Sequence, residues 1–518
     1  MNRRDLLAIF SITLLFRLAV AALQTHPGYM DAYYYTVGAQ RLVAGFDFTE
    51  PYVWNYLDPP TGLPHPSHLY WMPLPSVLSA IFMALFGSSY RAAQAPFVLL
   101  AAIVPLIAYA IAWRITAQRR AAWGAALLLI FSGFYLPFWG VPESFTPYAV
   151  FGSLALWMSG AGRSKRALLA AGVCAGLAHL SRADGMLLLA PMLFAQVLRM
   201  RDEGGRMKLN FILHPSSFLL IGYLLVMLPW FLRNIAVVGA PIAPAGAQTL
   251  WLCSYDELFS YGVRLDLNHW LGCGLDQMAI TKVRALGTGL AHLSAENGLV
   301  FLAPLMAAGL WRLRRQPGVR PALLYLVLLY LAMTLAFTFV GERGGLFHSS
   351  AALMPFLCAA APIGLETVVN AIARRRRTWN GEVAQRVFGI GAVALAALFS
   401  AALVWGRVIR SDWNRADAAY REAGAWLAGQ GDMDSIVMAG NPPGFTYHTG
   451  HPSIVIPNGE VDTLLAAARQ FNAKWLILDA NRPTPLAPLY DDPQLDPRLK
   501  LSATFDRAYL FQIADASR

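Results

Sequence analysis

His26-Pro-Gly-Tyr-Met-Asp31-Ala-Tyr-Tyr-Tyr35 is the stretch around which the chain is organised. It follows the first apolar segment almost at once and places one carboxylate among four tyrosines at a predicted membrane surface. Placing an ionisable side chain beside hydrocarbon costs free energy, so such a residue is a functional candidate by default. The free-energy cost is smaller at the membrane interface than at the centre of the bilayer. We therefore predict Asp31 as the catalytic centre. The alternative is a solvated loop acid within a belt of interfacial aromatic side chains.

The composition excludes an ordinary soluble enzyme. Of 518 residues, 57% are hydrophobic and 14% are charged, which is more apolar surface than globular cores bury. The formal net charge is +11, but Arg and Lys fall mostly in short runs between apolar segments. That pattern indicates membrane topology rather than a nucleic-acid partner. The sequence contains no P-loop and no Gly-x-Gly-x-x-Gly opening a helix.

Long apolar runs predict an α-helical polytopic membrane protein with about eleven transmembrane helices of roughly 17–25 residues each. The runs lie at residues 6–23, 91–113, 121–141, 145–160, 167–181, 185–199, 210–232, 293–311, 321–340, 346–369 and 384–406. The first has no small-residue cleavage site after it and is typical of a retained signal anchor. The run 73–87 is short and carries Pro73 and Pro75, so we predict that it does not cross the membrane.

Basic loops fix the predicted orientation. If 73–87 does not cross, the cytoplasmic loops are 114–120, 163–166, 199–208, 312–320 and 374–377, and all five are basic, as the positive-inside rule requires. Counting 73–87 as a span would invert all five. The outer loops 24–90 and 233–292 then lie on the non-cytoplasmic face of a cell (plasma or inner) membrane, together with everything after residue 406.

In the last part of the chain the long apolar runs give way to short stretches of strand length. This pattern predicts a small soluble α/β domain over residues 407–518, attached to a transmembrane domain over 1–406. Short strands are expected at 435–439, 453–456, 474–478, 499–505 and 509–513, and a helix at 461–471. Cys253 and Cys273 share the outer loop 233–292, where they form a disulfide in an oxidising compartment or stay as two free thiols. Cys174 and Cys358 lie in apolar runs and are expected to pack there.

Polar side chains gather at the outer ends of several predicted helices, where one cavity can receive them. Besides Asp31 they are Glu143, Arg182, Asp184, Glu342, Arg343 and His348. The arginines suit an anionic phosphate substrate, because the guanidinium fork matches phosphate oxygens. The acids suit a general base, because a desolvated carboxylate has a raised pKa. The alternative for each arginine is a side chain that extends to the lipid headgroups.

The outer loop 47–72 is rich in Pro, Trp and Tyr, whose aromatic faces stack on sugars or lie at the interface. It contains His65 and His68, which with an acid could hold a divalent metal, or could simply be hydrogen-bonded to their neighbours. We assign no metal. The predicted substrate-binding residues are Tyr33, Tyr34, His65, His68, Trp71, Asp184, Glu342 and His348.

These motifs resemble the GT-C superfamily of polyprenyl-phosphate-sugar-dependent glycosyltransferases, the group that includes protein O-mannosyltransferases and aminoarabinose lipid A transferases. The resemblance covers roughly residues 1–406. It rests on Asp31-Ala-Tyr-Tyr-Tyr after the first helix, His65-Pro-Ser-His-Leu-Tyr-Trp-Met-Pro-Leu-Pro before a segment ending in Leu85-Phe-Gly87, Pro142-Glu-Ser-Phe, Leu180-Ser-Arg-Ala-Asp-Gly-Met, and the run 348–355 leading into an apolar helix. Many relatives carry Asp-Glu where this chain has Asp31-Ala32, and lysine is common where it has Arg182.

The resemblance implies an inverting transfer of a sugar from a polyprenyl-phosphate-linked donor at the outer membrane face. On that basis Asp31 is the general base, Glu143 a second acid that positions acceptor or metal, and Arg182 and Arg343 neutralise the departing lipid phosphate. The acceptor would be a lipid, a polysaccharide or a protein, with membrane lipids as surroundings. The alternative function is a transporter or flippase for a lipid-linked glycan, which would show internal repeats or broken helices and gates on both faces. A non-catalytic assembly protein would not need Asp31.

Overall fold

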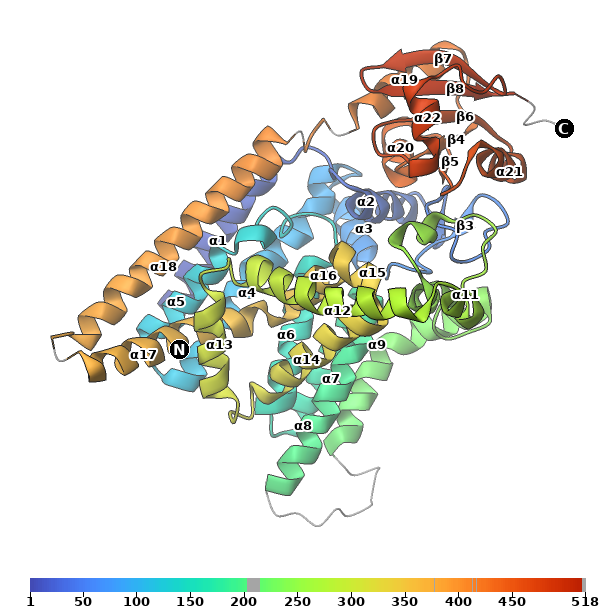
Figure 1. The fold of residues 1–518 in the computed structure, drawn as a ribbon. Helices are drawn as coiled ribbons and strands as arrows, with labels where there is room; N and C mark the ends of the chain where they lie inside the picture. The colour runs from blue at the N-terminus through green and yellow to red at the C-terminus, as the bar shows by residue number, and fades with distance from the viewer. Residues whose placement is uncertain (203–214, 377, 412, 416, 515–518) are drawn as a thin grey trace.

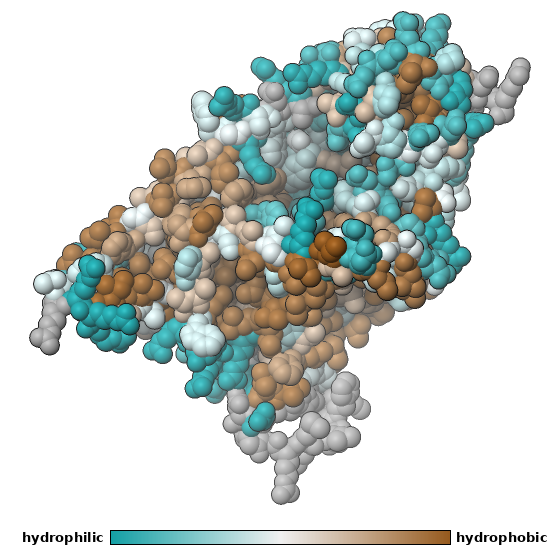
Figure 2. All heavy atoms as spheres, viewed as in Figure 1, coloured by the Kyte–Doolittle hydropathy of each residue, from teal (hydrophilic) through white to brown (hydrophobic). Residues whose placement is uncertain are grey.

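The computed structural model describes residues 1–202, 215–376, 378–411, 413–415 and 417–514. Figure 1 shows a large helical body, formed by residues 3–404, and a smaller C-terminal unit, formed by residues 418–513, which sits at one end of it. Figure 2 shows apolar side chains spread over the helical body and polar ones over the C-terminal unit. On α18 (Gly381–Val404) alone, Ile390 is 65% and Leu398 66% exposed, which suits contact with lipid.

Every apolar run singled out in the sequence contains a described helix. The helices of the body are α1 (Arg3–Leu23), α2 (Met30–Val43), α3 (Leu74–Phe86), α4 (Tyr90–Thr116), α5 (Arg119–Ile130), α6 (Phe145–Ala161), α7 (Lys165–Ser181), α8 (Leu189–Asp202), α9 (Pro215–Val238), α10 (Pro244–Gln248), α11 (Leu267–Gly272), α12 (Leu275–His292), α13 (Ala303–Leu313), α14 (Arg320–Leu331), α15 (Thr338–Val340), α16 (Leu346–Ser350), α17 (Met354–Arg375) and α18.

Five helical segments within the described residues are long and apolar enough to cross a membrane. They are Arg3–Leu23, Tyr90–Thr116, Ser216–Val238, Thr338–Arg375 and Gly381–Arg410. The membrane class of the fold is thus confirmed, and the count of eleven spans stays a prediction. Helix α3 has 13 residues, or about 20 Å of helix, against a hydrocarbon core of about 30 Å. Its length favours the expectation that the run 73–87 does not cross.

Helices α7 and α9 pack at very close range along the first half of α7. A Cβ on Gly172 would lie 2.0 Å from the carbonyl oxygen of Leu219, and one on Gly222 would lie 2.2 Å from that of Leu169. Only glycine allows this approach from both sides, as is common between membrane helices. Larger residues here would push α7 and its C-terminal loop out of place.

The C-terminal unit contains α19 (Ala418–Gly429), α20 (Pro442–Thr449), α21 (Val461–Phe471) and α22 (Ala487–Asp491), with strands β4 (Ile436–Ala439), β5 (Ser453–Val455), β6 (Ala473–Leu478), β7 (Leu499–Phe505) and β8 (Ala508–Ile513). The strands and the 461–471 helix expected from the sequence are confirmed. With β2 (Tyr52–Val53), these strands form a six-stranded sheet of order β2-β5-β4-β6-β8-β7, parallel from β2 to β6 and antiparallel at β8 and β7.

One strand of that sheet comes from the first outer loop. Strand β2 (Tyr52–Val53) pairs in parallel with β5, with Tyr52 opposite Ser453. The neighbouring strands β1 (Thr49–Glu50) and β3 (His65–Pro66) form a separate antiparallel pair. Helix α2, whose residues 32–39 are all buried, therefore lies between the helical body and the C-terminal unit. In the loop 233–292, Cys253 and Cys273 form a disulfide with Cα atoms 6.0 Å apart.

Candidate active site

Three titratable side chains from distant parts of the chain meet at one point. Asp31 lies in the first turn of α2, Glu143 just before α6, and His348 in α16. A ligand atom of each lies within 4.8 Å of the other two. The Nδ1 atom of His348 is 3.1 Å from a carboxylate oxygen of Glu143. We call these three residues the acid cluster.

Glu143 is held as an ionised carboxylate. It is 1% exposed, and it accepts hydrogen bonds from the Ser144 hydroxyl at 2.6 Å and the Phe145 backbone amide at 3.2 Å. Burial opposes its ionisation, but His348 and the hydrogen bonds from Ser144 outweigh this and lower its pKa to about 2. Glu143 therefore supplies fixed negative charge and orients His348.

Asp31 has the opposite electrostatic setting. Burial raises its pKa to about 6, helped by the charge of Glu143 and opposed by His348 and Arg182. Two neighbouring carboxylates whose surroundings move their pKa values apart are the usual arrangement for a proton-transferring acid beside a permanently charged one. Asp31 is the member that can exchange a proton near neutral pH.

Arg182 ties the cluster to two neighbouring helices. Its Nε donates to Asp184 at 2.9 Å and to the Ser349 hydroxyl at 2.9 Å, and its NH1 donates to the Ser144 hydroxyl at 3.4 Å. Ser349 also donates to Asp184. The guanidinium is thus fixed in orientation beside Glu143 rather than extended to the surface.

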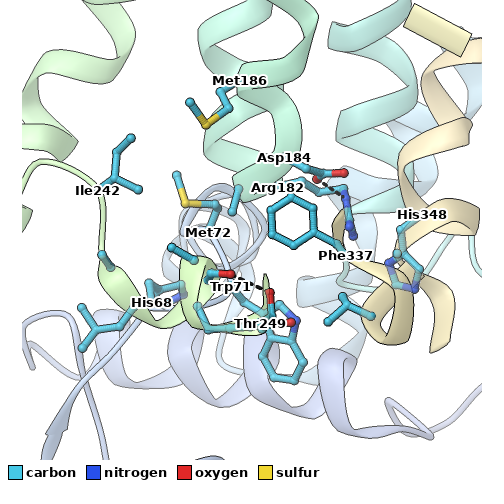
Figure 3. A pocket seen from close by; sticks show the side chains of 18 of the residues that line it. His68, Trp71, Met72, Arg182, Asp184, Met186, Ile242, Thr249, Phe337 and His348 are labelled. Carbon is cyan, nitrogen blue, oxygen red and sulfur yellow. Dashed lines mark hydrogen bonds and ion pairs between the residues drawn. The ribbon is translucent and has the colours of Figure 1, made fainter. Parts of the chain in front are cut away.

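A cavity of about 310 Å³ opens beside the acid cluster. Asp31, Arg182, Asp184, Arg343 and His348 line it, with His68 and Trp71 from the outer loop. Figure 3 shows Arg182, Asp184 and His348 on one side of the cavity and the apolar side chains Met72, Met186 and Ile242 on the other. The cavity therefore has a charged part and an apolar part.

Arg343 reaches the cavity from a break in the helical chain between α15 and α16. Gly344 has φ +116°, a conformation open to glycine and strained for other residues, and Arg343 itself has non-helical torsions. The guanidinium lies over the ring of Tyr255, 5.1 Å from its centroid. Among the described residues it forms no ion pair, so its charge is available to an anion.

Four residues predicted for the site lie elsewhere. The Tyr33 hydroxyl is 3.0 Å from Nε2 of His448 in α20, and the buried Tyr34 accepts a hydrogen bond from the His68 amide. His65 contacts Glu50 and Asp58, and Glu342 accepts from Thr288 at 2.9 Å. None of Tyr33, Tyr34, His65 and Glu342 lines the cavity.

The two histidines of the outer loop do not share a ligand site. Both ring nitrogens of His68 face hydroxyls, with Ser67 at 2.8 Å and Ser76 at 3.0 Å, and burial lowers its pKa to about 3. His65 points to other partners. The hydrogen-bonded alternative therefore describes this pair. Trp71 does take part in an aromatic wall, stacked on Trp54 with ring centroids 3.9 Å apart.

Several cavity residues were not predicted. Tyr35 lines the cavity and lies four positions after Asp31 on α2, so helical spacing would have placed both on one face. Tyr255, and the hydroxyls of Ser144 and Ser349 that hold Arg182, carry no comparable sequence signal. They are recognisable only from the packing of α6, α16 and the loop 233–292.

Comparison with known proteins agrees with this architecture. Residues 65–232 match the model of a family described as dolichyl-phosphate-mannose-protein mannosyltransferase. No curated protein matches the sequence. The residues matched by the family model include α3 to α8 and thus Glu143, Arg182 and Asp184.

Solved structures share the fold at low identity. ArnT from Cupriavidus metallidurans, solved bound to undecaprenyl phosphate, is 14% identical over 100% of both chains with a TM-score of 0.58. The oligosaccharyltransferase AglB from Archaeoglobus fulgidus, solved with an inhibitory peptide and a dolichol-phosphate, is 15% identical over 92% of this chain and 69% of its own, with a TM-score of 0.55. Arabinofuranosyltransferase AftD from Mycobacteria is 15% identical over 99% of this chain and 42% of its own, with a TM-score of 0.52. Residues 65–232 thus resemble the mannosyltransferase family, and the chain shares the fold of ArnT, AglB and AftD.

Proposed function

We propose that this membrane enzyme transfers a sugar from a polyprenyl-phosphate-linked donor to an acceptor hydroxyl or amine, with inversion at the anomeric carbon. The observation that carries the proposal is the acid cluster, which meets a cavity that also holds two arginines and an apolar wall. A lipid-linked sugar phosphate needs each of these parts: a base for the acceptor, positive charge for the phosphate, and apolar surface for the prenyl chain.

Asp31 is the proposed general base. The acceptor attacks the anomeric carbon from the face opposite the phosphate, its proton passes to Asp31, and the bond between that carbon and the phosphate oxygen breaks. Glu143 keeps Asp31 in the range where it can accept a proton, because its fixed charge raises the pKa of Asp31. His348 contacts Glu143 at 3.1 Å and has a ring nitrogen within 4.8 Å of a carboxylate oxygen of Asp31.

Arg343 and Arg182 are the proposed phosphate ligands. Negative charge develops on the lipid phosphate as the bond breaks, and a preorganised guanidinium stabilises it without rearranging. Arg182 is the fixed member because Asp184 and Ser349 hold it, and Arg343 is the one whose charge is not neutralised by a described acid. Met186, Leu187 and Phe337 line the apolar part, which suits a prenyl chain.

A divalent cation fits the acid cluster by donor type. Two carboxylates and an imidazole, with one atom of each within 4.8 Å of the others, are ligands found around Zn²⁺. A cation held by Asp31, Glu143 and His348 would polarise the acceptor and lower its pKa. The proton transfer to Asp31 described above needs only the residues of this chain.

We place the site on the non-cytoplasmic face. Helix α6 begins beside Glu143 and ends beside Arg163, and α7 begins at Lys165 and ends beside Arg182, so the site and these basic loop residues lie at opposite helix ends. Cysteines at two exposed positions test this. Arg264→Cys in the loop 233–292 should react with a membrane-impermeant maleimide in intact cells, and Arg375→Cys at the end of α17 only after lysis. The reverse pattern would refute this orientation.

The activity is tested by incorporation of radiolabelled sugar from synthetic polyprenyl-phosphate-sugars into membranes that contain the protein. Wild type should transfer from at least one donor, and Asp31→Asn should transfer about 10²-fold to 10⁴-fold more slowly. Asp47→Asn is the matched control, because Asp47 is an exposed acid in the same outer loop. Transport of a lipid-linked glycan across proteoliposomes without transfer would instead identify a flippase.

A further inference from the structure

A second cavity lies at the other end of the helical body. Its volume is about 440 Å³, and Arg114, Arg163, Arg199 and Arg320 line it. No carboxylate is among its described lining residues. We call it the arginine pocket. The function proposed above makes no use of it.

The arginine pocket is separate from the active site. Helix α6 connects the two, with Phe145 beside the acid cluster and Gly160 and Ala161 in the arginine pocket. At 1.5 Å per residue its 17 residues span about 25 Å. Four elements converge here: the end of α4, the link between α6 and α7, the end of α8, and the link between α13 and α14.

Two segments that line the arginine pocket pack closely against each other. A Cβ on Gly160 would lie 2.2 Å from the carbonyl oxygen of Pro317, and one on Gly318 would lie 2.6 Å from the ring of Trp157. The end of α6 and the link before α14 are thus in direct backbone contact. The arginines surround a formed hollow instead of standing on a flat basic surface.

The guanidinium groups differ in how they are held. Arg199 donates to the carbonyl oxygens of Gly162 at 2.6 Å and Gly160 at 3.3 Å, so it is fixed at the end of α6. Arg114 and Arg163 form no ion pair with any residue that the structure describes. Like charges around one hollow repel, and an anion inside it removes that repulsion.

We propose that the arginine pocket binds a phosphate group, as the headgroup of an anionic lipid or as a free phosphate anion. Guanidinium forks pair with phosphate oxygens two at a time, so several arginines can surround one phosphate. Basic pockets between transmembrane helices on the cytoplasmic side are typical sites for anionic lipid headgroups. The orientation proposed above places the pocket on that side, while phosphate binding itself does not depend on the orientation.

The test uses purified full-length protein in detergent and native mass spectrometry with dioleoyl phosphatidic acid, with dioleoyl phosphatidylcholine as the neutral comparison. Wild type should retain phosphatidic acid, and Arg114→Gln/Arg163→Gln should bind it about tenfold to thirtyfold more weakly. The control variant is Arg120→Gln/Arg314→Gln. It removes two charges from the basic loops outside the pocket, where Arg120 faces Glu382 and Arg314 stacks on Trp311, and should bind as wild type does.

Inorganic phosphate distinguishes the two sources. A rise in the melting temperature of wild type with sodium phosphate, relative to sodium chloride at equal ionic strength, that is lost in Arg114→Gln/Arg163→Gln shows that the anion alone suffices. Phosphatidic acid binding without that rise shows that the lipid is required. Equal loss of phosphatidic acid in both double variants, or retention equal to phosphatidylcholine in wild type, would overturn the proposal in favour of diffuse surface charge. Melting of each variant without ligand confirms that it is folded.

Discussion

The hydroxyl of Tyr33 lies 3.0 Å from Nε2 of His448, and this contact joins the helix that carries Asp31 to α20 of the C-terminal unit. The ring of Tyr33 also lies against Tyr447, with centroids 5.1 Å apart. Since Asp31 is two residues away on α2, the C-terminal unit helps to set the position of the proposed base.

Tyr33→Phe should lower stability and transfer together. The loss of one buried hydrogen bond costs about 0.5–1.5 kcal/mol, and a small displacement of α2 moves Asp31 from the acceptor. Thermal melting and sugar transfer measure the two effects. Tyr52→Phe removes a hydroxyl that donates to the Tyr34 carbonyl at 3.3 Å and leaves the contact between Tyr33 and His448 in place, so it should affect transfer less. Equal losses in both variants would contradict a positioning role for Tyr33.

The rate of transfer should rise with pH through a midpoint near 6. Asp31 must be ionised to accept a proton, and burial raises its pKa to about 6, so below that pH the rate should fall about tenfold per pH unit. Asp31→Asn should lose about 10²-fold to 10⁴-fold in rate and leave a residual activity without this midpoint. A wild-type profile that is flat between pH 5 and 7 would remove Asp31 as the base.

Glu143→Gln should move that midpoint to lower pH. The charge of Glu143 is one of the causes that raise the pKa of Asp31, so its removal lets Asp31 ionise more easily. The rate at the plateau should also fall, because His348 loses its 3.1 Å partner. Measurement of the pH profile in both proteins separates these effects. An unchanged midpoint would show that the two carboxylates do not interact.

The two arginines should differ in their tolerance of lysine. Arg182 donates from Nε to both Asp184 and Ser349, which an ammonium on a flexible stem cannot reproduce, so Arg182→Lys should lose most activity. Arg343 offers charge beside Tyr255 without an acid partner, so Arg343→Lys should keep part of the activity and Arg343→Gln should not. Inhibition of transfer by free polyprenyl phosphate, which should weaken in Arg343→Gln, reports the phosphate contact directly.

His65 should stabilise the outer loop in a pH-dependent way. Burial opposes its protonation, but the carboxylates of Asp58, 3.0 Å from Nε2, and Glu50, 3.6 Å from Nδ1, outweigh this and raise its pKa to about 9 from its usual 6.5. A raised histidine pKa gives stability that is fully present below pH 6.5 and lost as pH rises through 9. His65→Gln should therefore lower the melting temperature at pH 6 more than at pH 9.5. His292→Gln, beside Glu296, is the exposed control.

Much of the architecture was readable from the sequence, because hydrophobic length and periodicity are local properties. The apolar runs became helices, the strands of the C-terminal unit lie at the expected positions, and 461–471 is the helix α21. Cavity-lining residues were recognisable because a charged group at the end of an apolar helix costs free energy and is therefore a functional candidate. Examples are Asp31, Arg182, Arg343 and His348.

Which part of the protein each face of α2 meets depends on tertiary structure. Tyr33 and Tyr34 neighbour Asp31 in the sequence, yet a helix turns about 100° per residue and points them at the C-terminal unit and the outer loop, while Tyr35 shares the cavity with Asp31. The same holds for β2, a two-residue strand whose only reason to form is the edge offered by β5.

The sequence by itself determined that the chain is a membrane protein with a small C-terminal α/β unit, and which charged residues stand at helix ends. The order of apolar and polar residues along the chain sets which segments can be buried in lipid or protein. Only the tertiary structure decided which of those residues meet. The contact of His348 with Glu143, the pKa values of Asp31 and Glu143 on opposite sides of their usual range, and the hollow among four arginines all arise from long-range packing, which no local pattern encodes.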